Sequence, residues 1–111
     1  MKDLHWQGSS YQDYLDFPEE TQDDLGYQLH LLQSGRDPRD WKVLKSLGKG
    51  ISGVYEIRTS TNSDIYRVAY VTKIADSIVI LHSWQKKTEA TAKSDINLIV
   101  DRYRSAMKEL T

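Results

Sequence analysis

The stretch of residues 53–88, GVYEIRTSTNSDIYRVAYVTKIADSIVILHSWQKKT, decides the fold of this chain. It contains three runs, 54–59, 66–72 and 77–84, that are rich in Tyr, Ile and Val, residues enriched in β-strands. Polar breaks of hairpin length at 62–64 and 73–76 separate the runs. Because such short connections cannot cross over a sheet to join parallel neighbours, we expect a meander of three antiparallel strands.

The sequence before this stretch predicts a strand and two helices. Residues 3–7 indicate a short strand, and Ser9 or Ser10 is a suitable N-cap for a short helix that ends at Phe17. Residues 18–34 predict a second helix with acids near its start, a leucine stripe, and Gly35 as C-cap. Residues 41–47 leave two interpretations open, a ragged strand or a turn.

The sequence after the stretch predicts one last helix. Ser94 is a suitable N-cap for DINLIVDRYRSAMKEL, whose apolar residues recur at helical spacing. We therefore expect a single α+β domain over residues 1–111. It would have a small antiparallel sheet of about three to five strands, two N-terminal helices and one C-terminal helix.

Composition narrows the classes of function. The chain has no cysteine, which excludes disulfides and thiolate zinc sites. It has no apolar run long enough to span a membrane and no signal-peptide core, so we expect a cytoplasmic protein. The net charge of -1 hides an uneven distribution, because residues 1–35 carry -6 and residues 36–111 carry +5. Only the larger, C-terminal part therefore suggests a nucleic-acid partner.

Metal and phosphate-loop chemistry find little support. The three histidines, His5, His30 and His82, are scattered, and no metal-binding spacing occurs. Residues 48–50, Gly-Lys-Gly, lack the spacing of a phosphate-binding loop and are interpreted as a turn. We expect neither a metal nor a cofactor.

Cleavage of RNA fits the basic and aromatic residues better. Attack by the 2′-hydroxyl requires a base, an acid and cations around the phosphate, but no metal. Arg58 and Arg67 suit the phosphate, and His82 is the side chain suited to proton transfer near neutrality. The candidate catalytic set is Arg58, Arg67, His82, Lys86 and Lys87, and the candidate RNA-binding set is Tyr70, Trp84, Lys45 and Lys49, with Tyr70 and Trp84 suited to stack on bases. The candidates between Arg58 and Lys87 lie on adjacent strands or at the exit of one strand, so we expect them to converge on one surface.

Each candidate also has a structural interpretation. His82 and Trp84 have the strand parity of Ile78 and Ile80, which would place them on a buried or half-buried face. Arg58 has an acid of the same parity, Glu56, with which it can pair, and lysine pairs are usually solvated. From the residues alone we infer a basic sheet surface that binds RNA. The functional and the structural interpretation of each candidate both stay open.

Three segments in order, VYEIR, IYRVAYV and IVILHSWQKKT, give the chain a family resemblance. Together with the lead-in LLQSGRDPRDWKVLKSLGKGISG, they resemble the HigB-like, phage-derived branch of the RelE/ParE toxin superfamily, over residues 25–104. The resemblance implies a RelE-like α+β toxin that cleaves messenger RNA on the ribosome. It also implies a cognate helix-turn-helix, HigA-like antitoxin that holds the toxin inactive.

The resemblance also implies roles for individual residues. Arg58 and Arg67 match the sheet arginines of the branch, and its paired lysines fall on Lys86 and Lys87. His82 matches a position often occupied by His, and Trp84 stands where Phe is common. Two alternatives remain: a ParE-like toxin that inhibits DNA gyrase without cleaving RNA, and an inactive phage-derived interaction domain.

Overall fold

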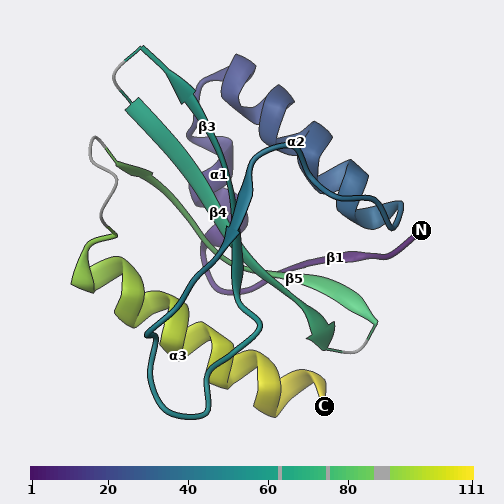
Figure 1. Ribbon diagram of the computed structural model, residues 1–111, viewed down its shortest axis with the longest axis vertical. Coiled ribbons are helices and arrows are strands. Elements are labelled where there is room, and N and C mark those ends of the chain that lie inside the picture. The colour runs from purple at the N-terminus through teal and green to yellow at the C-terminus, as the bar shows by residue number, and fades with distance from the viewer. Residues whose placement is uncertain (63, 75, 87–90) are drawn as a thin grey trace.

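One mixed sheet forms the middle layer of the protein, with helices on both of its faces (Figure 1). The computed structural model describes residues 1–62, 64–74, 76–86 and 91–111, and within them the sheet has five strands in the order β1-β5-β4-β3-β2. The elements are β1 (Leu4–Trp6), α1 (Ser10–Leu15), α2 (Glu19–Gln33), β2 (Trp41–Val43), β3 (Tyr55–Thr61), β4 (Asp64–Ile74), β5 (Ser77–Lys86) and α3 (Lys93–Leu110). The expected α+β fold class is confirmed.

The expected meander is present as β3, β4 and β5, which pair antiparallel with their neighbours. Of the two interpretations of residues 41–47, the strand is correct for Trp41–Val43, which pairs antiparallel with β3, whereas residues 44–47 lie outside the strand. The first strand departs from a purely antiparallel sheet, since β1 pairs with β5 in parallel, with Leu4 opposite Ile78. The long intervening chain, which includes two helices, makes this crossover possible.

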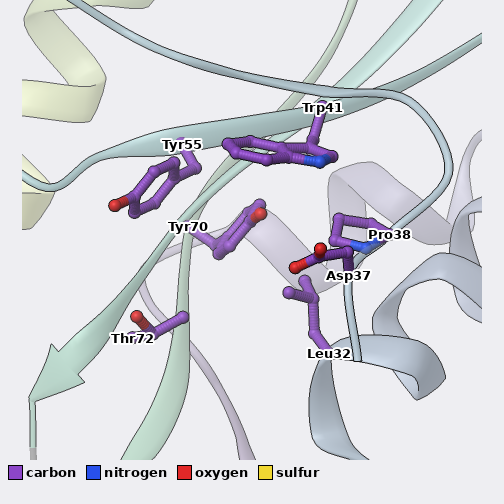
Figure 2. Close-up of a pocket in the computed structure, with 7 residues that line it drawn as sticks. All are labelled: Leu32, Asp37, Pro38, Trp41, Tyr55, Tyr70 and Thr72. Atoms are coloured by element: carbon purple, nitrogen blue, oxygen red, sulfur yellow. The ribbon is translucent and has the colours of Figure 1, made fainter. Parts of the chain in front are cut away.

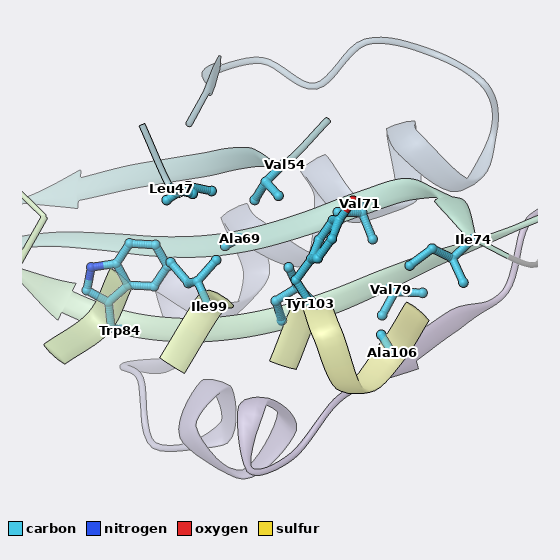
Figure 3. Close-up of a cluster of buried hydrophobic side chains, with 11 residues drawn as sticks. Leu47, Val54, Ala69, Val71, Ile74, Val79, Trp84, Ile99, Tyr103 and Ala106 are labelled. Atoms are coloured by element: carbon cyan, nitrogen blue, oxygen red, sulfur yellow. The ribbon is translucent and has the colours of Figure 1, made fainter. Parts of the chain in front are cut away.

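Each face of the sheet has its own hydrophobic core. Helix α3 covers one face, here called the α3 face, whose core includes Val71, Leu81, Ile99 and Tyr103 (Figure 3). Helices α1 and α2 cover the other, here called the α2 face, with a core that includes Leu25, Leu29, Val68 and Ile80. Residues alternate between these cores along β4, as the period of two in a strand requires.

In β5, a β-bulge interrupts the corresponding alternation. Ala69 lies opposite His82, but the next residue of β4, Tyr70, lies opposite Ile80, so Leu81 is the extra residue. His82 therefore faces α3, whereas Ile80 packs on the α2 face. The expectation that His82 and Trp84 share a face with Ile78 and Ile80 is wrong for this reason.

The helix ends follow local chemistry with small differences. Helix α2 ends at Gln33 with Ser34 as its C-cap, one residue before the expected Gly35. Gly35 follows with φ of 78° and donates its N–H to the carbonyl of Leu32 at 3.1 Å. Helix α3 begins at Lys93 after Ala92, so Ser94 lies inside its first turn rather than at the N-cap. None of the described helices combines the length and apolar character needed to cross a membrane.

Candidate functional site

A row of cations crosses the α3 face of the sheet, near the end where β5 leads toward α3. Arg58 on β3 lies opposite Arg67 on β4, which lies opposite Trp84 on β5. Lys86 follows two residues after Trp84 and so faces the same way. The register thus brings three of the candidate catalytic cations, Arg58, Arg67 and Lys86, to one face; we call these three residues the cation row.

Arg67, the middle residue of the row, is fully buried. Its Nε lies 3.5 Å from Oε2 of Glu56, and both side chains have 0% exposure. Its Nη1 donates a hydrogen bond of 3.1 Å to Oγ1 of Thr91, and Lys42 approaches the other oxygen of Glu56 at 3.8 Å. In this conformation the guanidinium of Arg67 neutralises a buried carboxylate and does not reach solvent.

Arg58 and Lys86, the outer residues of the row, are partly exposed. The side chain of Arg58 is 29% exposed and its Nε lies 3.3 Å from Oδ1 of Asp40. The side chain of Lys86 is 27% exposed and its Nζ lies 3.6 Å from Oδ2 of Asp95. Because ion pairs at a surface contribute only about 0–1 kcal/mol, a phosphate can compete with these carboxylates for both cations.

His82 lies between two charged side chains of α3, the carboxylate of Asp95 and the guanidinium of Arg102. Its Nε2 lies 2.8 Å from Oδ1 of Asp95, and its Nδ1 lies 3.3 Å from Nη1 of Arg102. A guanidinium can only donate, so Nδ1 accepts and Nε2 carries the proton that is donated to Asp95. Burial lowers the pKa of His82 below its usual 6.5, and although Asp95 acts in the opposite direction, the nearby charge of Arg102 also lowers it. The imidazole is therefore neutral at pH 7.

Arg102 connects this histidine to the N-terminal part of the chain. Its guanidinium donates to the carbonyl of Leu81 at 3.1 Å and to Oγ of Ser9 at 2.9 Å. Ser9 in turn donates to Asp13 at 2.9 Å. A continuous polar network therefore joins the start of α1, the bulge in β5 and the middle of α3.

The two candidate stacking residues lie on opposite faces of the sheet. Trp84 is buried in the α3-face core, where its ring stacks on His82 with centroids 4.9 Å apart and an interplanar angle of 9° (Figure 3). Tyr70 is buried on the α2 face, where its ring stacks on Tyr55. The expectation that Tyr70 converges with the cations on one surface is wrong, because Tyr70 and Arg67 point to opposite faces of β4.

Tyr70 instead forms the floor of a cavity of about 200 Å³ (Figure 2). Its lining consists of aromatic, apolar and acidic residues: Leu32, Asp37, Pro38, Trp41, Tyr55, Tyr70 and Thr72. Burial raises the pKa of the Tyr70 phenol, and the neighbouring Tyr55 and Asp37 raise it further, so the phenol stays protonated.

Two of the remaining candidates, Lys45 and Lys49, lie outside the sheet. Lys45 and Lys49 are exposed on the segment that joins β2 to β3, and Leu44, Leu47 and Ile51 of this segment pack against the α3-face core. Neither lysine lies on the strands that carry the cation row. Lys87 lies outside the residues that the structure describes.

Of the acids that pair with these cations, the sequence nominated Glu56, as a partner of Arg58, but not Asp40 or Asp95. The structure places Glu56 beside Arg67. Asp40, Glu56 and Asp95 hold the cation row, and Arg102 holds His82. Helical spacing offered one signal, since Asp95 and Arg102 are two turns apart and therefore share a helix face with Ile99. Within the part of the chain that the structure describes, no three His, Asp or Glu side chains are grouped as metal ligands would be.

Comparison with protein families finds a family whose model matches most of the chain. The model of the phage-derived, Gp49-like proteins (DUF891) matches residues 12–104. The chain belongs to this family. The match runs from α1 into α3, so every candidate site residue of the Gp49-like protein lies within it, whereas β1 lies outside. No curated protein sequence matches the chain significantly.

Proposed function

We propose that this Gp49-like protein is the toxin of a type II toxin–antitoxin system and that it cleaves messenger RNA on the ribosome. Its phage-derived family is associated with toxin-like proteins, which supports the toxin role. The observation that carries the nuclease role is the cation row. Lys86, one of its two partly exposed residues, and His82 both contact the carboxylate of Asp95.

The proposed reaction uses only groups of the RNA and of this chain. The 2′-hydroxyl gives its proton to His82 and attacks the adjacent phosphorus, the bond from phosphorus to the 5′-oxygen breaks, and the 5′-oxygen takes a proton from the ammonium of Lys86. The products are a 2′,3′-cyclic phosphate and a 5′-hydroxyl end. Arg58 and Lys86, the partly exposed cations, would bind the phosphate and stabilise the negative charge that builds up on it. Arg67 would act from behind as a buried positive charge.

His82 is the proposed proton acceptor. Because its pKa is lowered, the imidazole is neutral near pH 7 and is able to take a proton, as a general base must. Asp95 would stabilise the imidazolium that forms, since it already accepts a hydrogen bond from Nε2. Burial of His82 means that the RNA must first displace Arg102 from Nδ1.

The partners follow from the same proposal. A helix-turn-helix antitoxin would keep the toxin inactive, and the ribosome would present the message, which places the activity in the cytoplasm. Lys45 and Lys49, exposed beside the α3-face core, would add contacts to RNA phosphates. An adjacent reading frame that encodes a helix-turn-helix protein would support this arrangement.

The test is controlled expression of this chain with primer extension on a reporter message. The proposal predicts new 5′-hydroxyl ends within the translated region, and their absence from a matched reporter that lacks its start codon. Arg58→Ala and Lys86→Ala should each lower cleavage by about tenfold or more, as expected for loss of a group that stabilises transition-state charge. Arg104→Ala, which removes an exposed cation from α3, is the matched control and should cleave as the unsubstituted protein does.

Cleavage that persists in both Arg58→Ala and Lys86→Ala would contradict the site. These two variants are more informative than Arg67→Ala, because their surface ion pairs contribute at most about 1 kcal/mol and the fold should survive.

The burial of Arg67 and His82 favours a second candidate, a toxin that binds DNA gyrase and cleaves nothing. In that case expression would arrest growth and leave the message intact. A supercoiling assay with purified gyrase separates the two, since only this candidate inhibits supercoiling. Expression with neither growth arrest nor cleavage would contradict both toxin roles.

A further inference from the structure

We propose that the cavity under Trp41 receives a lysine or arginine side chain from a basic, extended segment of a protein partner. The cavity lies on the α2 face, on the opposite side of the sheet from the cation row (Figure 2). The proposal does not depend on the nuclease, because no residue of the cation row lines this cavity.

Aromatic rings form one side of the cavity. Trp41 is 44% exposed and meets Tyr55 edge to face, with ring centroids 5.8 Å apart. Tyr55 stacks on Tyr70 at the same centroid distance of 5.8 Å. The faces of such rings attract cations, most strongly when water is excluded.

A carboxylate completes the cavity. Asp37 lies across from the rings, beside Pro38, and its charge acts on the phenol of Tyr70 (Figure 2). Aromatic faces with one carboxylate match an ammonium or guanidinium group that arrives on an alkyl stem. A cavity of about 200 Å³ is smaller than the roughly 300–1,000 Å³ of small-molecule sites, which favours a single side chain as the occupant.

The charge in the lining of the cavity favours a basic protein segment over a nucleic acid. Among the lining residues, Asp37 carries the charge. Its carboxylate attracts an ammonium or guanidinium group and repels a phosphate. A nucleobase would find the same rings, but its phosphates would lie near this carboxylate.

The edge of the sheet supplies a path for such a segment. Strand β2 is the last strand on its side, and Asp40 and Leu44 on either side of it direct backbone groups to β3. The antiparallel alternation then points the backbone groups of Trp41 and Val43 outward. An extended segment that pairs with this edge would place one side chain over the cavity, the mode of recognition known as β-strand addition.

The test is nuclear magnetic resonance of the full, nitrogen-15-labelled chain titrated with a short peptide, Thr-Val-Arg-Val-Thr, blocked at both ends. We expect saturable shifts of the Trp41 indole and of the β2 amides. A peptide with citrulline, the neutral isostere, in place of arginine should bind about tenfold more weakly, because it loses the charge and keeps the shape. Asp37→Asn should weaken binding of the arginine peptide by a similar factor. Trp41→Leu should weaken it by a similar factor too, because leucine keeps an apolar side chain at this position but lacks the aromatic ring.

Asp23→Asn is the matched control, since it removes an acid from the N-terminal end of α2, away from the cavity, and should bind as the unsubstituted chain does. Equal binding of the citrulline peptide, or no effect of Asp37→Asn, would overturn the proposal. So would shifts confined to the α3 face. A single-stranded oligouridylate that shifts the Trp41 indole when the arginine peptide does not would replace the basic segment with RNA.

Discussion

Arg67 of β4 and Glu56 of β3 form an ion pair inside the protein, with 3.5 Å between Nε and Oε2 and no exposed surface on either side chain. Removing one partner leaves the other charge buried. We therefore expect Arg67→Met to lower the free energy of unfolding by about 3–5 kcal/mol, measured by urea denaturation. The contact of Lys42 with Glu56 should keep the loss toward the lower end.

The double substitution Arg67→Met with Glu56→Leu distinguishes loss of charge balance from loss of packing. It removes both charges, so it should be more stable than Arg67→Met alone. If instead the two single losses simply add, the pair is not coupled. This prediction also bears on activity, because a loss of toxicity in an Arg67 variant is interpretable only beside its unfolding curve.

The pH dependence of stability should report on His82. Its pKa in the folded state is lowered, so below its usual 6.5 the unfolded chain binds more protons than the folded one. Stability from this group is therefore complete well above pH 6.5 and is lost progressively as the pH falls from the unfolded value toward the lowered folded value. We expect thermal midpoints to decrease between about pH 7.5 and 5.5, and His82→Gln to flatten that slope. His30→Gln, on the exposed side of α2, should retain it.

A side chain at Gly8 should lower the free energy of unfolding more than one at Gly35. Its φ is 57°, and an added Cβ would lie 2.7 Å from Nε of Arg102, which is held by Leu81, Ser9 and His82. Gly35 has a similar φ of 78° but has nothing within 4 Å of an added Cβ. Both Gly→Ala changes incur the conformational cost of about 1–2 kcal/mol. Gly8→Ala should lose about 1.5–3 kcal/mol more, since Arg102 must give up a hydrogen bond.

The imidazole signals of His82 provide the second measurement for this pair. Gly8→Ala should raise the pKa of His82, because Arg102 helps to lower it, and Gly35→Ala should leave its titration unchanged. Equal denaturation curves for the two variants would show that Arg102 moves away without cost.

Adjacent residues of α3 should differ sharply in their contribution to the α3-face core. Ile99 is fully buried against the sheet (Figure 3), whereas Leu98 is 39% exposed. Ile99→Ala should lower the free energy of unfolding by about 2–5 kcal/mol, because it leaves a cavity. Leu98→Ala should change it by no more than about 0.5 kcal/mol. If Ile99→Ala and Leu98→Ala lowered the free energy of unfolding by similar amounts in chemical denaturation, α3 would not be anchored through Ile99.

The strands of the meander were predictable because Tyr, Ile and Val dominate them and polar turns separate them. The structure extends β4 from the expected 66–72 to Asp64–Ile74 and β5 from 77–84 to Ser77–Lys86. The bulge at Leu81 was not predictable, since no glycine or other local signal marks it. Its effect is large, because one extra residue moves His82 to the other face.

The candidate site was predictable in part. Strand parity already separates Tyr70 from Arg67, which lie three residues apart, so the sequence contained the signal that they face opposite ways. The burial of Arg67 was not readable from the sequence, because it depends on Glu56 across the sheet and on Thr91 near the start of α3. Exposure of a strand residue is decided by what covers the sheet, and local pattern does not show that.

The parallel pairing of β1 with β5 has a consequence for how the chain is made. Leu4 leaves the ribosome before its partner Ile78, which follows roughly 70 residues later. At synthesis rates of about 5–20 residues per second, the first strand waits on the order of ten seconds for a place in the sheet. Strand β1 is thus the first strand of the sheet to be made and among the last to be secured.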